Sequence, residues 1–483
     1  MRHGIAPIFG GLLLAACAVG PEYRTPPPVA IGEGWTQPVS TGATDLARWW
    51  SALDDAVLGR LIDTALAQNL DLQQAAARID EARAVRDRVA GGQMPVVAAG
   101  ASVNRRRQSE NGPLPIGTIP GLDANQTIFD AGFDAAWEVD LFGANRRAVQ
   151  AASARLQATE AEAQGIRMRI IAEVARTWFT AVGADNELRA QQARLATLQH
   201  TLDLMRQRQA AGDASVADVD AARAQWAAAG AALPEIQARQ RAAILGLGLL
   251  LGAPPERELA LLDGGHALPA PLTLPVGERA DILRRRPDVL AAERQLAAST
   301  ADIGIATAEL FPKLSIGAGG GFQALNTGDW FDSASARYSI LPLISWRLFD
   351  GGRVRAEIRA REAAGRRAAL AYEQAVLAAL GDAEQALGNY RAGLDTLEQR
   401  GTALDATRRS YAHAGARHKA GDISLIELLA AQRLLDEAET AEIRARTATS
   451  VQLVALYKAL GGGWNAPDVP AQLMNRDTST SAP

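Results

Sequence analysis

Residues 129–143 read Phe-Asp-Ala-Gly-Phe-Asp-Ala-Ala-Trp-Glu-Val-Asp-Leu-Phe-Gly, and this stretch decides the fold class. Apolar residues occupy the odd positions from Phe129 to Leu141, and acidic residues recur at the even positions between them. A period of two with one apolar face predicts a half-buried β-strand. The stretch is also long enough for a tilted strand to cross a bilayer, which takes about ten residues.

Three further stretches alternate in the same way. Together they predict four strands, at about 95–106, 127–142, 312–324 and 336–349. Trp137, Tyr338 and Trp346 could serve as the aromatic girdle that membrane strands place at the lipid–water interface. A small soluble sheet packed on helices would give the same alternation, so this alternative stays open.

The chain is organised as two copies of one unit. Leu141-Phe142-Gly143 is echoed by Leu348-Phe349-Asp350, and Ala211-Gly212-Asp213 is echoed by Ala420-Gly421-Asp422. An offset of roughly two hundred residues indicates a duplicated domain rather than a solenoid. The predicted parts are a signal peptide at 1–16, an N-terminal tether at 17–50, a first repeat at 51–265, a second repeat at 266–463 and a flexible C-terminal tail at 464–483.

Each repeat is expected to end in a pair of long helices, at about 144–251 and 352–461. Leu188, Leu195 and Leu202 fall seven residues apart, and such spacing predicts supercoiled helix packing. A helix from 144 to 211 would be about 100 Å long, which a globular domain cannot surround. Pro234 is expected to kink or locally break the second helix.

The N-terminus has the pattern of a secretory signal that ends at a cysteine. Arg2 and His3 precede an apolar stretch, and two alanines precede Cys17. This resembles the bacterial lipobox, in which the cysteine receives a lipid, and Ala18 favours the outer membrane by resemblance to lipoprotein sorting. An ordinary signal peptide with an incidental cysteine is the alternative.

Composition argues against several other classes of protein. A net charge of −4 with interspersed signs does not predict a nucleic-acid-binding surface. The five histidines lack metal-ligand spacing, and no set of nucleophile and base appears, so we expect no enzyme, cofactor or metal. The arginines at 284–286 are interpreted as a solvated helix end.

Four membrane strands in one chain cannot stand alone, because two open edges would leave backbone groups unsatisfied in hydrocarbon. Three chains would supply about twelve strands, an even number within the range of outer-membrane barrels. The predicted fold class is therefore α+β: a duplicated unit supplies four transmembrane strands, one third of a 12-stranded trimeric barrel, and coiled-coil-like helices form a periplasmic α-barrel.

The sequence resembles outer-membrane efflux proteins of the TolC family, in particular the lipoprotein branch typified by OprM and NodT. The matching stretches include Val19-Gly20-Pro21-Glu22-Tyr23, residues 137–143 and residues 283–289, and the resemblance extends from about residue 17 to 461. It implies a homotrimer, a periplasmic adaptor (membrane fusion) protein and an inner-membrane pump, which is expected to be proton-driven. It also implies a location in the outer membrane that extends into the periplasm.

The resemblance assigns roles to the turns of the helix pairs. In the family these turns meet the adaptor, and the matching residues are Gly212, Asp213, Gly421 and Asp422. The glycines are equally expected as helix C-caps.

The adjoining positions form a closed gate in the family, and they match Asp218, Ile426, Glu427 and Ala430. Three copies of Glu427 would make an acidic ring. Many relatives have Asp where this chain has Ala430, so the ring is weakened or moved to Glu427. A merely solvated Glu427 is the alternative.

These observations predict a passive exit duct for drugs or other small toxic molecules. Two alternatives remain: the same duct could serve type I protein secretion, or the chain could be a periplasmic coiled-coil scaffold lipoprotein without a pore.

Overall fold

The computed structural model describes residues 18–26, 32, 34–37, 46–109, 113, 123–263, 265–272 and 276–464. Cys17, the signal peptide and residues 465–483 therefore lie outside the described residues. The chain divides into two units. We call residues 1–27, 79–159 and 292–372 the sheet unit, and residues 28–78, 160–291 and 373–483 the helical unit.

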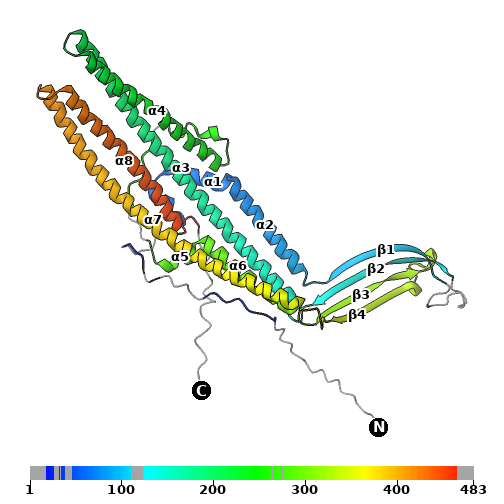
Figure 1. The fold of residues 1–483 in the computed structure, drawn as a ribbon. Helices are drawn as coiled ribbons and strands as arrows, with labels where there is room; N and C mark the ends of the chain where they lie inside the picture. The colour runs from blue at the N-terminus through cyan, green and yellow to red at the C-terminus, as the bar shows by residue number, and fades with distance from the viewer. Residues whose placement is uncertain are drawn as a thin grey trace, which may run out of the picture. The chain divides into compact units, whose positions relative to one another are not determined.

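The sheet unit contains one antiparallel sheet of four strands in the order β1-β2-β3-β4 (Figure 1). The strands are β1 Val96–Arg107, β2 Asn125–Val139, β3 Lys313–Ala324 and β4 Ala336–Ser345. All four predicted strands are present. The last one ends at Ser345 rather than at about 349, because the chain leaves the sheet there and the Trp346 indole donates instead to the carbonyl of Leu310, at 3.0 Å.

The pairing register separates the residues of the sheet into an apolar and a polar face. Ala99, Phe133, Gly320 and Tyr338 lie side by side across the strands on the apolar face. Tyr338 is 89 % exposed and Phe133 65 % exposed, which is unusual for water-facing aromatic residues but expected for residues that face lipid.

The polar face carries an ion pair that reaches over a glycine. Gly132, Gly321 and Arg337 are neighbours in the register. Because Gly321 has no side chain, Arg337 reaches across β3 and donates two hydrogen bonds to Asp130, at 3.0 and 2.6 Å.

The helices repeat the same lengths in both halves of the chain. The first half contains α2 Leu70–Gly91, α3 Ala144–Ala210 and α4 Val216–Leu250, with 22, 67 and 35 residues. The second half contains α6 Pro287–Ala308, α7 Arg353–Lys419 and α8 Leu425–Ala459, again with 22, 67 and 35 residues. Each half also places two strands between its 22- and 67-residue helices, so the chain is a duplicated unit.

The remaining elements are short. They are α1 Ala56–Gln68, α5 Arg279–Arg285 and the 3-10 helices Trp49–Leu53, Pro255–Glu258, Thr327–Asp329 and Ser333–Ser335. Within the part of the chain that the structure describes, no helix combines the length and hydrophobicity needed to span a bilayer.

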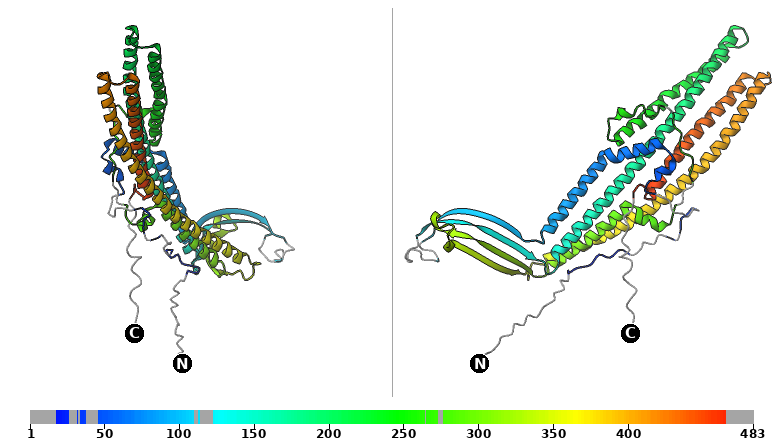
Figure 2. Two further views of the ribbon diagram at one scale, coloured as in Figure 1. Left: turned by 60° about the vertical axis from the view of Figure 1, so that its left-hand side comes forward. Right: turned by 180° about the vertical axis from the view of Figure 1, so that it is seen from behind.

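In the helical unit, α3 with α4 and α7 with α8 form two antiparallel hairpins (Figures 1 and 2). Leu202 and Met205 of α3 pack against Val219 and Ala222 of α4, as the heptad spacing predicts. Of the kink or local break predicted at Pro234, the break is wrong, because α4 continues through this residue. The burial of apolar side chains on both sides of this proline, at Ala229 and Ile236, holds the helix together.

Aromatic residues anchor the core of the helical unit. Trp49 stacks on Tyr457 with ring centroids 4.6 Å apart. The fully buried Trp178 donates from its indole to Asp55, at 2.7 Å, and the same carboxylate caps the start of α1. The contact between Trp49 and Tyr457 joins segments from both halves of the sequence.

Candidate functional site

The two hairpin turns have the same backbone structure. Gly212 and Gly421 both have φ of +83°, a left-handed conformation that glycine adopts without strain. Asp213 donates its N–H to the carbonyl of Arg208, at 2.8 Å, and Asp422 donates to Arg417, at 2.9 Å. These bonds satisfy the last carbonyls of α3 and α7, so both glycines are helix C-caps. The turns themselves are exposed.

A capping box follows each turn. Ser215 and Ser424 each accept a hydrogen bond from the backbone N–H three residues on, at 3.2 and 3.3 Å. In return, Asp218 and Glu427 accept the backbone N–H of their serine, at 2.9 and 2.8 Å. Backbone hydrogen bonds therefore hold the pKa of both carboxyl groups below their ordinary values, and both are ionised at neutral pH.

The assignment of Asp218 and Glu427 to the gate overlooks this structural role, which the sequence also indicates. Serine followed three residues later by an acidic residue is the pattern of a capping box. Glu427 is exposed and tied to the start of α8, so it is more than a freely solvated side chain.

The other predicted gate positions are exposed on the first turns of α8. Ile426 is 68 % exposed and Ala430 is also exposed, whereas Leu429 between them is buried. Ile426, Glu427 and Ala430 thus share the outward side of α8, while Asp218 belongs to α4. The structure places these residues at the two hairpin ends.

Two ion-pair contacts join α3 to α8. No local pattern of the sequence predicts them. Glu187 on α3 is buried and accepts hydrogen bonds from Arg239 on α4, at 2.8 Å, and from Arg444 on α8, at 3.0 Å. Arg194 on α3 lies 2.9 Å from the carboxylate of Asp436 on α8. Burial raises the pKa of Asp436 to about 6, and Arg194 offsets only part of this effect.

The described N-terminal residues form a strap, which we define as Val19–Tyr23. Val19 donates its N–H to the carbonyl of Phe142, at 3.1 Å. The buried Arg147 of α3 donates to the carbonyls of Val19 and Gly20. Tyr23 donates its hydroxyl to Glu293 of α6 and lies under the guanidinium of Arg294, 5.5 Å from the ring centroid.

The strap fixes where the modified cysteine would be attached to the folded protein. Gly143, at the start of α3, is so close to Ala18 that a side chain there would clash with it. Cys17 itself lies outside the described residues, but its neighbour Ala18 is held at the junction between β2 and α3.

The interpretation of residues 284–286 as a solvated helix end is wrong for Arg286. This side chain is buried and donates to Asp288, at 2.9 and 2.6 Å, and to Asp382, at 3.2 Å. Asp382 lies on α7, far along the chain, so the local sequence could not reveal the pair. Among the described residues, no group of three or more potential ligands could hold a metal ion.

The family described as "Outer membrane efflux protein" matches residues 61–253 and 279–462, which is most of the chain. The chain belongs to this outer membrane efflux family. The pyoverdine export outer membrane protein OpmQ of Pseudomonas putida is 32 % identical, and the alignment covers 94 % of this chain and 96 % of OpmQ. The outer membrane protein OprJ of Pseudomonas aeruginosa is also 32 % identical, over 96 % of each chain.

Solved structures agree with the sequence relatives. The outer-membrane channel OprN has a TM-score of 0.84 and 36 % identity, over 93 % of this chain and 100 % of that one. The predicted fold class, outer-membrane location and channel function are thereby confirmed. As an outer membrane efflux protein, the chain is not an enzyme but one subunit of a trimeric exit duct, which works with a periplasmic adaptor and an inner-membrane pump.

Proposed function

We propose that the duct exports small toxic organic molecules and that the inner-membrane pump behind it is proton-driven. The observation that supports the duct itself is the sheet, because its apolar face is exposed and its outer strands β1 and β4 have free edges within the described chain. Such a sheet is stable in lipid only when copies close it into a channel. Relatives named for solvent and toluene efflux in Pseudomonas putida, each 29 % identical, support this class of cargo.

Ion conductance in planar bilayers tests the duct directly. Purified protein should run as a heat-modifiable trimer and should conduct ions after reconstitution. A monomer that gives no conductance would exclude the duct and favour a scaffold without a pore.

Loss of the chain tests the cargo and the energy source. Cells without it should become more sensitive to toluene and should retain a fluorescent efflux substrate, and an uncoupler of the proton gradient should have the same effect on cells that contain it. If only a secreted protein were lost from the medium, the cargo assignment would be wrong and protein secretion would replace it.

We also propose that Glu427 forms an acidic ring at the closed end, between the adaptor-contacting turns. Glu427→Gln is a clean test, because glutamine can still complete a capping box and only the charge is removed. The variant should reduce the sensitivity of single-channel conductance to divalent cations. Asp213→Asn, which removes an exposed charge from the other turn, is the matched control, and an unchanged response of the Glu427 variant would sink the ring.

The lipid anchor at Cys17 is the third part of the proposal. It is supported by the signal sequence and by the strap, which begins two residues after the cysteine. Mass spectrometry of the mature protein should find an N-terminal cysteine with attached acyl chains, and Cys17→Ser should abolish both the acyl mass and cleavage at this position. An unmodified thiol on the mature protein would disprove the anchor.

A further inference from the structure

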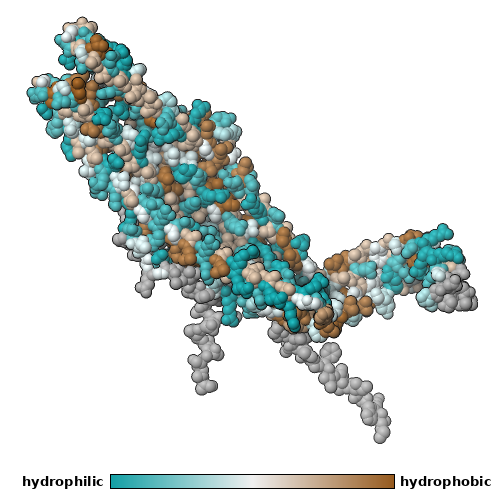
Figure 3. Space-filling model, viewed as in Figure 1, coloured by the Kyte–Doolittle hydropathy of each residue, from teal (hydrophilic) through white to brown (hydrophobic). Residues whose placement is uncertain are grey.

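Large apolar side chains are exposed where the chain leaves the sheet. We define the apolar collar as Ile344, Trp346, Leu348 and Phe349, which are 71, 56, 80 and 92 % exposed. Figure 3 shows hydrophobic residues gathered where the strands meet the helices. Exposed apolar residues at the end of a membrane strand, with a tryptophan among them, are typical of the boundary between acyl chains and headgroups.

Unpaired arginines follow the collar on the first turns of α7. Arg355 and Arg359 are both exposed and, four residues apart, lie on one face of the helix. No carboxylate among the described residues pairs with either of them. Their neighbour Arg361, in contrast, donates to Glu357 at 2.7 Å. Two like charges side by side repel each other, and an anionic group bound between them would relieve this repulsion.

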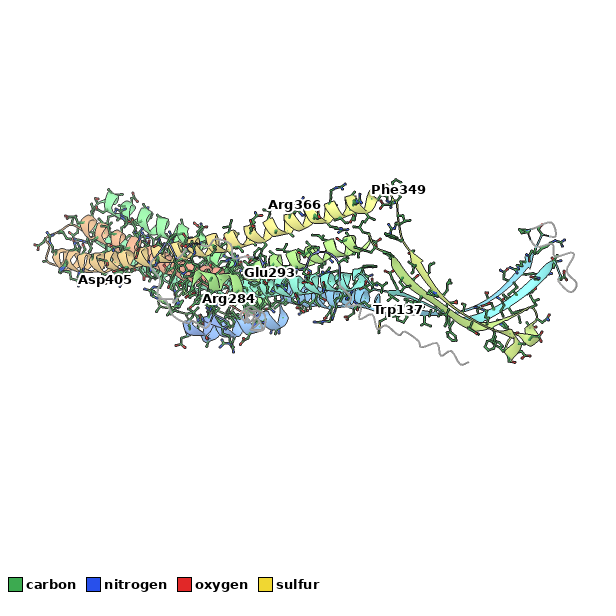
Figure 4. All side chains as sticks on the ribbon, turned by 90° about the horizontal axis from the view of Figure 1, so that it is seen from below. Trp137, Arg284, Glu293, Phe349, Arg366 and Asp405 are labelled. Carbon is green, nitrogen blue, oxygen red and sulfur yellow. The ribbon has the colours of Figure 1, made fainter. Side chains whose placement is uncertain are left out.

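The position of the arginine pair relative to the collar suits the headgroup layer. The helix α7 begins at Arg353, and with a rise of about 1.5 Å per residue Arg355 and Arg359 lie about 3 and 9 Å along it from that start. A headgroup layer is roughly 5 to 8 Å thick, and an arginine can extend its long side chain toward it. Arg366 lies about 20 Å from the start of α7 by the same measure, outside this reach (Figure 4 labels Phe349 and Arg366).

We propose that Arg355 and Arg359 bind the phosphate of an anionic phospholipid in the periplasmic leaflet, while the apolar collar contacts its acyl chains. Guanidinium groups suit this role, because they donate paired hydrogen bonds to phosphate oxygens in addition to their charge. Basic residues beside a membrane surface contribute attraction to anionic lipid that adds to apolar contact. The inference depends on the outer-membrane position of the sheet and not on the gate or the cargo.

Quenching of tryptophan fluorescence by brominated lipids tests the proposal on the intact trimer. Trimers are reconstituted in mixtures of phosphatidylcholine and phosphatidylglycerol, with bromine on one lipid at a time, and Trp346 in the collar reports which lipid is adjacent. The measured quantity is the binding constant for phosphatidylglycerol relative to phosphatidylcholine. Trp346→Phe identifies the part of the signal that comes from the collar.

Wild-type trimers should prefer phosphatidylglycerol, and the preference should weaken as salt is raised. The double variant Arg355→Gln/Arg359→Gln should lower the relative constant by about fivefold for each arginine removed, toward equal binding. The matched control Arg366→Gln/Arg367→Gln removes two exposed arginines farther from the collar and should keep the wild-type ratio. The single variant Arg359→Gln carries the test if the double variant does not form trimers.

Three results would overturn the proposal. The first is equal binding of the two lipids by wild-type trimers. The second is a double variant that keeps the wild-type ratio, above all if its trimers are also less heat-stable, since the arginines would then pair with a neighbouring subunit. The third is a control that loses the preference as fully as the double variant does.

Discussion

Replacing Asp436 by asparagine should stabilise the protein at neutral pH. The Asp436 side chain is 12 % exposed, and burial raises its pKa from 3.8 to about 6 despite the nearby Arg194. The folded protein therefore holds a proton between about pH 4 and pH 6 that the unfolded chain has released. The free energy of unfolding falls as pH rises through this window, by an upper bound on the order of 3 kcal/mol.

Asparagine keeps the size of the side chain and removes the charge that is costly to bury. We expect the variant to match the wild type near pH 4 and to exceed it by about 2 kcal/mol at pH 7.5. Denaturant unfolding of the trimer, followed by circular dichroism at fixed protein concentration and at pH 4.5, 6.0 and 7.5, measures the difference. Asp405→Asn, which removes a carboxylate that is 66 % exposed, is the control and should change little at any pH.

Two results would contradict this reasoning. One is a variant less stable than the wild type at pH 7.5, which would mean that the pair with Arg194 outweighs the burial of Asp436. The other is a difference between the two proteins that stays constant from pH 4.5 to 7.5, since the carboxylate would then not titrate in this window.

Three further predictions concern the joints of the fold. Asn69→Ala removes a buried amide that caps α2 and donates to the end of α4. The free energy of unfolding should therefore fall by about 2 to 3 kcal/mol in a denaturant assay. In the same assay the exposed control Gln74→Ala should change it by no more than about 0.5 kcal/mol. Gly421→Ala places a side chain at φ +83°, which costs about 1 to 2 kcal/mol and should speed amide hydrogen exchange at the turn. Gly415 lies inside α7 with free space around it, so Gly415→Ala should slow amide exchange there. Tyr23→Phe removes the hydroxyl that holds the strap, at a cost of about 1 kcal/mol. The variant should be cleaved faster by a protease within residues 18–26. Cleavage at the wild-type rate would mean that this hydrogen bond does not stabilise the strap.

The strands could be located from the sequence because a sheet with one lipid-facing side imposes strict alternation. The end of β4 could not, since Trp346 and Leu348 continue the alternation after backbone pairing has stopped. The alternation of the sequence indicates which side chains face lipid. The last backbone hydrogen bond of a strand depends instead on where its partner strand ends. The duplication was readable for a different reason: it needs only a comparison of the chain with itself.

The site was predictable only where its geometry is local. Glycine at the hairpin turns and serine three residues before an acidic residue are local patterns, because the hydrogen bonds they predict join neighbours in the chain. Arg444 lies 257 residues from Glu187, and Arg286 lies 96 residues from Asp382. Such pairs arise from the packing of distant helices, so a solvated arginine and a buried one look alike in the sequence.

The strap has a consequence for the order of events while the protein is made. Its tyrosine hydroxyl bonds to a carboxylate 270 residues later in the chain, and its backbone is held by α3. The first residues of the exported chain can therefore reach their final position only after Glu293 has been translocated and α6 has folded. Contacts between such distant positions form slowly. The strap therefore stays undocked during the earlier part of the chain's export.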